Sequence, residues 1–186
     1  MGLIILLVIL AVVVLWVIGA YNSLVALKNQ VLNGWKQIDV QLKRRHDLIP
    51  NLVNTVKGAM NFEKQTLEAV IAARNKAVNA SGVAATAKAE GELTQALGRL
   101  FALTEAYPDL KATGNIAQLQ EEITSTENKI GFSRQHYNDT ATAYNTKQMQ
   151  FPTNLVAGLA KAVPAELWEI EDAAERAVPK VDLSMN

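Results

Sequence analysis

Residues 116–144 read IAQLQEEITSTENKIGFSRQHYNDTATAY, and the spacing of residues in this stretch decides the fold class. Apolar and small polar residues recur at alternating steps of three and four, which is typical of one face of a packed α-helix. This face comprises Ile116, Leu119, Ile123, Thr126, Ile130, Ser133, Tyr137, Thr140 and Tyr144. The stretch therefore predicts a helix of about thirty residues that Phe151-Pro152 ends and whose face turns polar in its second half.

Residues on both sides of this stretch follow the same helical spacing. On the N-terminal side they are Val31, Trp35, Ile38, Leu42, Ile49, Leu52 and Val56. Two further helices are predicted, one within residues 61–78 and one from about Thr86 to Tyr107, because the loop-forming sequence NASGVAAT separates them. Gly91 and Gly98 lie on one face of the second of these helices, where we expect a close contact between helices.

Nothing in the sequence alternates like a strand between hairpin turns, so the chain is predicted to be all-α. Long helices joined by short links favour antiparallel neighbours. We expect an N-terminal transmembrane helix (residues 1–21) that is continuous with an antiparallel up-and-down helical bundle of about four long helices (residues 22–160). A short C-terminal amphipathic helix and tail (residues 161–186) should follow, with Pro164 in the first helical turn.

Leu3 to Ala20 form an apolar run, LIILLVILAVVVLWVIGA, without a charged residue. At about 1.5 Å per residue the run spans roughly 27 Å, close to the thickness of a hydrocarbon core. Trp16 and Tyr21 lie towards one end, where aromatic rings favour the membrane interface. The alternatives are a cleaved signal peptide and a buried core helix. A retained single-span anchor is favoured, because no Lys or Arg precedes the run and every helical face is apolar.

The distribution of cations around this run predicts its orientation. No Lys or Arg precedes it, whereas Lys28, Lys36 and the cluster of residues 43–45 follow it. The positive-inside tendency therefore predicts an outside N-terminus and a cytoplasmic helical domain.

Residues 41–53, QLKRRHDLIPNLV, interrupt the apolar spacing with a polar cluster. Asp47 could cap a new helix and Pro50 is tolerated in a first turn, which would make the segment a turn between two helices. Alternatively one helix continues and Pro50 only kinks it, because the apolar spacing is the same on both sides. The sequence leaves both interpretations open.

The 3–4 spacing places Arg45 on the core face, where a buried guanidinium needs an anionic partner. Glu121, Glu122 and Glu127 on the 116–144 helix are the candidates. We hypothesise that Arg44 or Arg45 pairs with one of them and fixes the helix register; the alternative is that both arginines are solvated above apolar surface. The expected structural or interaction network comprises Arg44, Arg45, Asp47, Glu121, Glu127, Arg134 and Asn138.

Composition and motifs argue against several classes of chemistry. The chain has 18 Lys+Arg and 18 Asp+Glu, so it lacks the basic excess of a nucleic-acid binder. It has no cysteine, no Glu-x-x-His motif for a di-metal site and no glycine-rich phosphate loop. His46 and His136 are expected to be surface residues. We therefore predict no catalytic residue, no cofactor and no metal, and a protein that is not an enzyme.

Three segments resemble the LemA family of bacterial membrane proteins. They are YNSLVALKNQVLNGWKQIDVQLKRRHDLIPNLVNTVKG (residues 21–58), EAYPDLKATGNIAQLQEEITSTENKIGFSRQHYNDTATAYN (105–145) and FPTNLVAG (151–158). The resemblance implies one N-terminal transmembrane helix followed by an α-helical bundle in the bacterial inner membrane, and it carries no enzymatic activity. At Met60 and Phe62 the chain departs from the family's aromatic-then-histidine pattern, so no role of that histidine is transferred.

Two functions are compatible with these features. Some LemA relatives are linked to membrane remodelling or organelle membranes, which suggests a self-associating scaffold in contact with the lipid bilayer. The alternative is an adaptor that binds another membrane protein, such as a protease or transporter, through Leu167, Trp168 and Ile170. Alternatively, these apolar residues serve only to pack the tail on the bundle.

Overall fold

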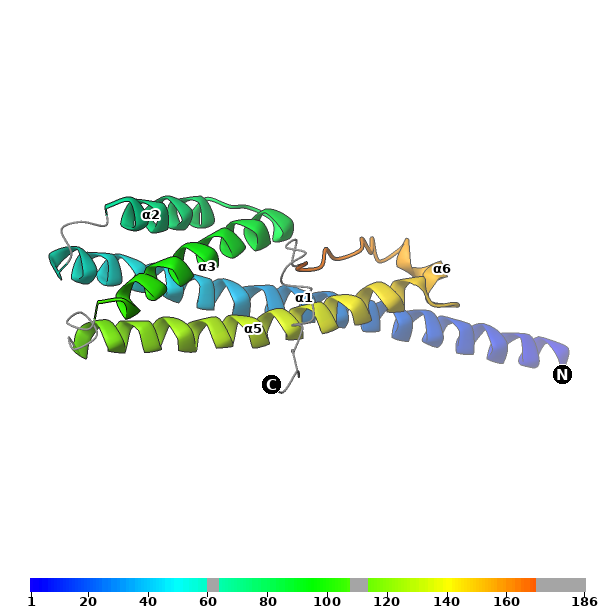
Figure 1. The fold of residues 1–186 in the computed structure, drawn as a ribbon. Coiled ribbons are helices and arrows are strands. Elements are labelled where there is room, and N and C mark those ends of the chain that lie inside the picture. Colours follow the sequence, from blue (N-terminus) through cyan, green and yellow to red (C-terminus); the bar gives the residue numbers. More distant parts are fainter. Residues whose placement is uncertain (60–63, 108–113, 170–186) are drawn as a thin grey trace, which may run out of the picture. The chain divides into compact units, whose positions relative to one another are not determined.

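The computed structural model describes residues 1–59, 64–107 and 114–169. The described part contains five helices and no strand, which confirms the predicted all-α class (Figure 1). The helices are α1 (Gly2–Ala59), α2 (Lys64–Val78), α3 (Val83–Glu105), α5 (Gly114–Met149) and α6 (Asn154–Ala157). Met60 and Phe62 lie outside the described residues.

Helix α1 is continuous from Gly2 to Ala59 and includes Pro50. The interpretation of residues 41–53 as a turn between two helices is therefore wrong, and the helix continues through the proline. Within the described residues, α1 alone is long and apolar enough to cross a membrane, and only 6% of its most apolar window is buried inside the protein. That low burial rules out a core helix for Leu3 to Ala20, since a core helix would be covered.

The chain divides into two compact units, each described by itself below. Unit 1 comprises Met1–Arg45 and Thr124–Leu167, and unit 2 comprises His46–Ile123 and Trp168–Asn186.

Unit 1 is built on an antiparallel contact between α1 and α5. Gly34 on α1 approaches α5 so closely that an added Cβ would lie 3.3 Å from the Cα of Tyr137. The Trp35 and Tyr137 rings contact each other beside this position at a centroid distance of 5.7 Å, with their planes tilted by 59°. Buried residues recur every seventh position on both helices, as expected for one packed face. They are Leu24, Val31, Ile38 and Arg45 on α1 and Ile130, Tyr137 and Tyr144 on α5.

Unit 2 contains an apolar core to which four helices contribute. Its centre is fully buried, with Ile49 and Leu52 from α1, Val70 from α2 and Leu93 from α3 all at 0% exposure. Ile116 and Ile123 from α5 complete the cluster. For α1 and α5, the predicted apolar faces therefore include residues that pack in this core.

Two smaller expectations are wrong. An added Cβ at Gly91 or Gly98 would meet nothing within 4 Å, so neither glycine marks a close contact between helices. Residues 162–169 form no helix, so the short C-terminal helix does not begin at Pro164. The rest of the segment predicted for that helix, from residue 170 onward, lies outside the described residues.

Candidate functional site

A buried ion pair joins the two long helices of unit 1. The Nη1 group of Arg45 donates a hydrogen bond to Oε2 of Glu127, one of the three carboxylates considered from the sequence. The Arg45 side chain is 1% exposed and the Glu127 side chain is 35% exposed. The pair therefore consists of an interior cation whose anionic partner reaches solvent, a geometry that limits the desolvation cost of the carboxylate.

The other residues of the expected network lie elsewhere. Arg44, Asp47 and Glu121 are exposed, so they are not part of a buried cluster. Arg134 and Asn138 on α5 are half-buried. The structure thus brings together Arg45 and Glu127 from the predicted set.

Unit 2 contains a second buried polar pair, which sequence reasoning missed. Nε2 of His46 lies 2.7 Å from Oε1 of Glu90 on α3, and the two side chains are 11% and 4% exposed. The backbone carbonyl of His46 accepts a hydrogen bond of 2.9 Å from Nε of Arg74 on α2. The expectation that His46 is a surface residue is wrong, because a carboxylate partner satisfies its ring nitrogen inside the helix packing. His136 is exposed, as predicted.

A histidine paired with a carboxylate also occurs in proton-transfer sites. A histidine and a carboxylate can exchange a proton, but catalysis also needs a reacting group within reach. Within residues 1–59, 64–107 and 114–169, no three His, Asp or Glu side chains are arranged to hold a metal ion. The pair joins α1 to α3 within unit 2.

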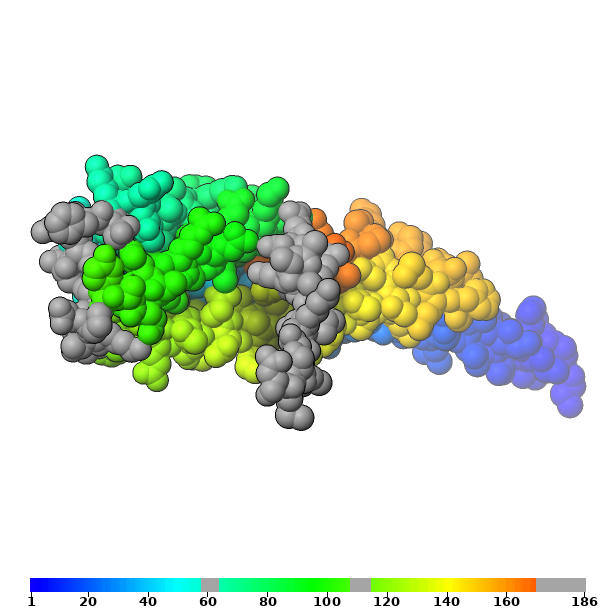
Figure 2. Space-filling view, in the orientation of Figure 1, coloured from blue at the N-terminus to red at the C-terminus, as the bar shows by residue number. Residues whose placement is uncertain are grey.

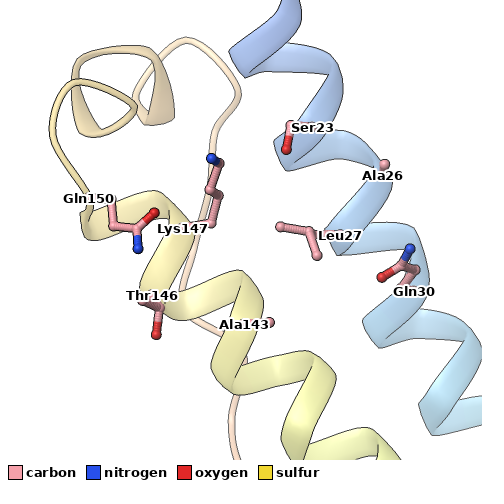
Figure 3. Close-up of a pocket in the computed structure, with 8 residues that line it drawn as sticks. All are labelled: Ser23, Ala26, Leu27, Gln30, Ala143, Thr146, Lys147 and Gln150. Atoms are coloured by element: carbon pink, nitrogen blue, oxygen red, sulfur yellow. The ribbon is translucent and has the colours of Figure 1, made fainter.

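A groove of about 580 Å³ lies in unit 1 between the start of the α1 packing face and the end of α5 (Figure 3). Leu27 points from α1 towards α5, and Lys147 extends towards the end of the groove where Ser23 lies (Figure 3). The lining residues are Ser23, Ala26, Leu27, Gln30, Ala143, Thr146, Lys147 and Gln150. The groove thus combines one cation with neutral hydrogen-bonding groups and contains no carboxylate.

A second groove of unit 1, about 600 Å³ in volume, lies beside Lys36, Gln41 and Ser133. The Oε1 atom of Gln41 is buried and has no hydrogen-bond partner among the described residues. A buried amide oxygen of this kind can accept a hydrogen bond from water or from a polar partner.

The family model described as "LemA family" matches residues 34–183 of the chain. The chain belongs to the LemA family. The match includes both α1 residues of the buried pairs, Arg45 and His46, and it continues past Gly158, where the resemblance read from the sequence ended.

A curated relative named for the same family agrees with this assignment. The chain is 32% identical to "Protein LemA" of Metamycoplasma hominis over 142 residues, which cover 75% of the chain and 64% of the relative. It is 23% identical to "Magnetosome protein MamQ 2" of Paramagnetospirillum magneticum over 83% of the chain and 66% of the relative. It is also 23% identical to "Magnetosome protein MamQ" of Magnetospirillum gryphiswaldense over 74% of the chain and 60% of the relative. The chain therefore spans less than two thirds of the length of these relatives.

In this LemA-family protein the segment after α6 returns along α5 in unit 1. Asn145 holds Ala165 by two hydrogen bonds, from its Nδ2 to the Ala165 carbonyl at 2.8 Å and from the Ala165 amide to its Oδ1 at 2.7 Å. The Tyr137 hydroxyl donates to the backbone carbonyl of Glu166 at 2.7 Å. Trp168 is 4% exposed, so its side chain is covered within the protein. Ile170 lies outside the described residues.

Burial and the nearby Glu166 carboxylate raise the pKa of Tyr137 above the ordinary tyrosine value of 10.0. The folded LemA-family protein therefore holds the phenolic proton at a pH where the unfolded chain releases it. The resulting stability is complete below about pH 10 and is lost as the pH rises from there towards the folded pKa.

Tyr137→Phe is expected to lower the free energy of unfolding by about 0.5–1.5 kcal/mol, because the hydrogen bond to Glu166 is removed. The variant should also lose less stability than the wild type between about pH 9 and about pH 11. Urea unfolding in detergent at both pH values measures the two effects. Parallel losses in the two proteins would contradict the role given to the Tyr137 proton.

Proposed function

We propose that this LemA-family protein is a non-enzymatic, single-pass membrane protein that self-associates as a scaffold in membrane organisation or remodelling. In this proposal Leu3 to Ala20 stay in the bacterial inner membrane and the N-terminus lies outside. The rest of unit 1 and all of unit 2 lie in the cytoplasm. The observation that supports it is the uninterrupted helix α1, which runs from a bilayer-length apolar segment straight into the packed faces of the protein. The similarity to proteins named for the magnetosome favours membrane organisation over a metabolic reaction.

Exposed apolar residues on α1 support self-association. Ile18, Val25 and Leu32 are spaced by seven residues, and they are 50%, 38% and 51% exposed. A spacing of seven keeps residues on one helix face, and here that face continues from the apolar segment into the cytoplasmic part of unit 1. Apolar surface of this kind is favourable to bury against a second copy.

The oligomeric state of the full chain in lipid nanodiscs or mild detergent tests the scaffold. We expect light scattering to give a mass above that of one chain, and we expect Val25→Gln combined with Leu32→Gln to shift the protein to the monomer. The matched control is Asn22→Gln combined with Asn29→Gln, since these exposed positions have the same spacing. A strictly monomeric wild type, or an equal effect of both double variants, would overturn self-association.

The anchor is tested separately by the N-terminal mass of the mature protein. We expect membrane-bound material that retains residues 3–20. Freely soluble protein beginning after Ala20 would show a cleaved signal peptide instead. The adaptor for a membrane protease or transporter stays the alternative proposal, although the buried Trp168 is not available as a contact.

A further inference from the structure

A group of large apolar side chains is exposed at the end of α5 and through α6. Met149, Phe151, Leu155, Leu159 and Val163 are 70%, 81%, 68%, 72% and 73% exposed. Single exposed apolar residues are ordinary, but five within residues 149–163 form a concentration that calls for a partner. Side chains of the bilayer-length segment are exposed to a similar or lower degree, with Leu3 at 71% and Leu10 at 58%.

Other residues of this segment pack in unit 1 and hold the segment in place by burial and hydrogen bonds. Thr153 and Val156 are buried at 6% and 2% exposure, so one side of the turn packs while Leu155 and Leu159 face outward. The amides of residues 154–157 and 160–162 donate to backbone carbonyls. The return of the chain is held at Ala165 by Asn145. The segment therefore exposes apolar side chains while its backbone is largely hydrogen-bonded. A backbone must be hydrogen-bonded in this way to enter a poorly hydrated environment.

The position of this segment along α1 identifies the partner. Gln150 lines the same groove as Ser23, which lies only about 4.5 Å along the helix axis beyond Ala20. The headgroup region extends about 5–7 Å beyond each side of the hydrocarbon core. The end of α5 therefore lies at the level of the headgroups when residues 3–20 span the bilayer.

Charge at this level suits an anionic leaflet. Neither residues 1–38 nor residues 140–165 contain an Asp or Glu, whereas they contain Lys28, Lys36, Lys147 and Lys161. Cations beside a membrane surface are attracted to anionic lipid headgroups.

We propose that residues 149–163 are a second membrane contact, an interfacial element that inserts Phe151, Leu155 and Leu159 into the leaflet on the cytoplasmic side. Lys147 and Lys161 then meet anionic headgroups. Such an element binds by apolar burial and electrostatic attraction together, without crossing the bilayer. This inference rests on the proposed membrane span of α1.

Depth-dependent quenching in vesicles tests the contact. The chain has no cysteine, so Leu155→Cys, Val8→Cys and Phe132→Cys each give one site for a polarity-sensitive dye on the full-length protein. Phe132 is the matched control, because it is 73% exposed on α5 and far from residues 149–163 in the sequence. Circular dichroism of each labelled variant verifies that the helices are intact.

We expect lipids that carry a quencher near the headgroup to quench the dye at position 155 several-fold more than the dye at position 132. Quenching at position 8 by a deep quencher, together with none at position 155, overturns the interfacial element and leaves the proposed anchor standing. Absence of quenching at position 8 overturns the anchor itself. Self-quenching that grows with protein density, without lipid quenching at 155, assigns the apolar side chains to a second copy.

Vesicle composition tests the contribution of the lysines. We expect stronger quenching at position 155 in vesicles that contain phosphatidylglycerol than in pure phosphatidylcholine. Lys147→Gln combined with Lys161→Gln should remove this difference. Equal quenching in both lipids overturns the role given to the two cations.

Discussion

Arg45→Glu is expected to lower the free energy of unfolding by about 3–5 kcal/mol, the cost of breaking a buried ion pair from one side. The substitution places a carboxylate in a position that is 1% exposed, and it sets that carboxylate against Glu127. At about 2–4 °C per kcal/mol for a chain of this length, the melting temperature should fall by roughly 6–20 °C. Thermal unfolding of the full-length protein in detergent, followed by circular dichroism, measures the shift.

The neighbouring Arg44 supplies the control for this substitution. Arg44 is exposed, so Arg44→Glu makes the same change in net charge while it leaves the buried pair intact. We expect that control to change stability by no more than about 0.5 kcal/mol. Arg45→Glu combined with Glu127→Arg should recover part of the loss, since the pair is restored with reversed polarity. Equal melting temperatures of the Arg44 and Arg45 variants would refute the assignment of a structural ion pair.

Glu90→Leu is the second substitution with a large expected effect. It should cost about 1–3 kcal/mol, because Nε2 of the buried His46 loses its acceptor while the surrounding helices still exclude water. Helix α3 contains a matched control two residues away, where Glu92 pairs with Lys76 at 2.6 Å on an exposed surface. Glu92→Leu should cost no more than about 1 kcal/mol, as is typical of exposed ion pairs. Urea unfolding of both variants in detergent compares the buried pair with the exposed one.

A double-mutant cycle separates the pair from the rest of the site. His46→Leu combined with Glu90→Leu should be more stable than the sum of the single effects predicts, because neither buried group is then left unpaired. Additive losses would mean that His46 and Glu90 contribute independently. The same outcome would leave helix packing, and not the polar contact, as the reason for their burial.

The regular helical spacing made the all-α fold predictable. The same spacing also places His46 and Glu90, the pair that was not predicted, on buried helix faces. His46 follows Leu42 by four residues and precedes Ile49 by three, so it lies on the same helical face as both. Glu90 precedes Leu93 by three residues on the buried face of α3. The prediction that His46 is a surface residue rested on its polarity and not on its position along the helix, and no prediction was made for Glu90. A buried polar residue is stable when a side chain of another helix forms a hydrogen bond with it, and that side chain is far away in the sequence.

Other features depended on tertiary contacts that no local pattern specifies. Pro50 is compatible with a turn or with a continuous helix, and packing of Ile49 and Leu52 in the core of unit 2 accompanies the continuous one. The choice of Glu127 over Glu121 and Glu122 follows from the antiparallel register of α1 and α5 in unit 1. The seven-residue spacing alone does not specify that register, since a shift by one repeat keeps the same faces in contact.

Helix α1 continues without a break from the proposed membrane span into the packed part of unit 1, so tilting of the span would move that part with it. Arg45 lies about 37 Å along the helix axis beyond Ala20. An inclination of about 20°, common for helices in bilayers, would displace Arg45 sideways by about 13 Å relative to an upright helix. Because a membrane helix can adapt to bilayer thickness by tilting, a thinner or thicker membrane would displace this end of α1 without any change in folding.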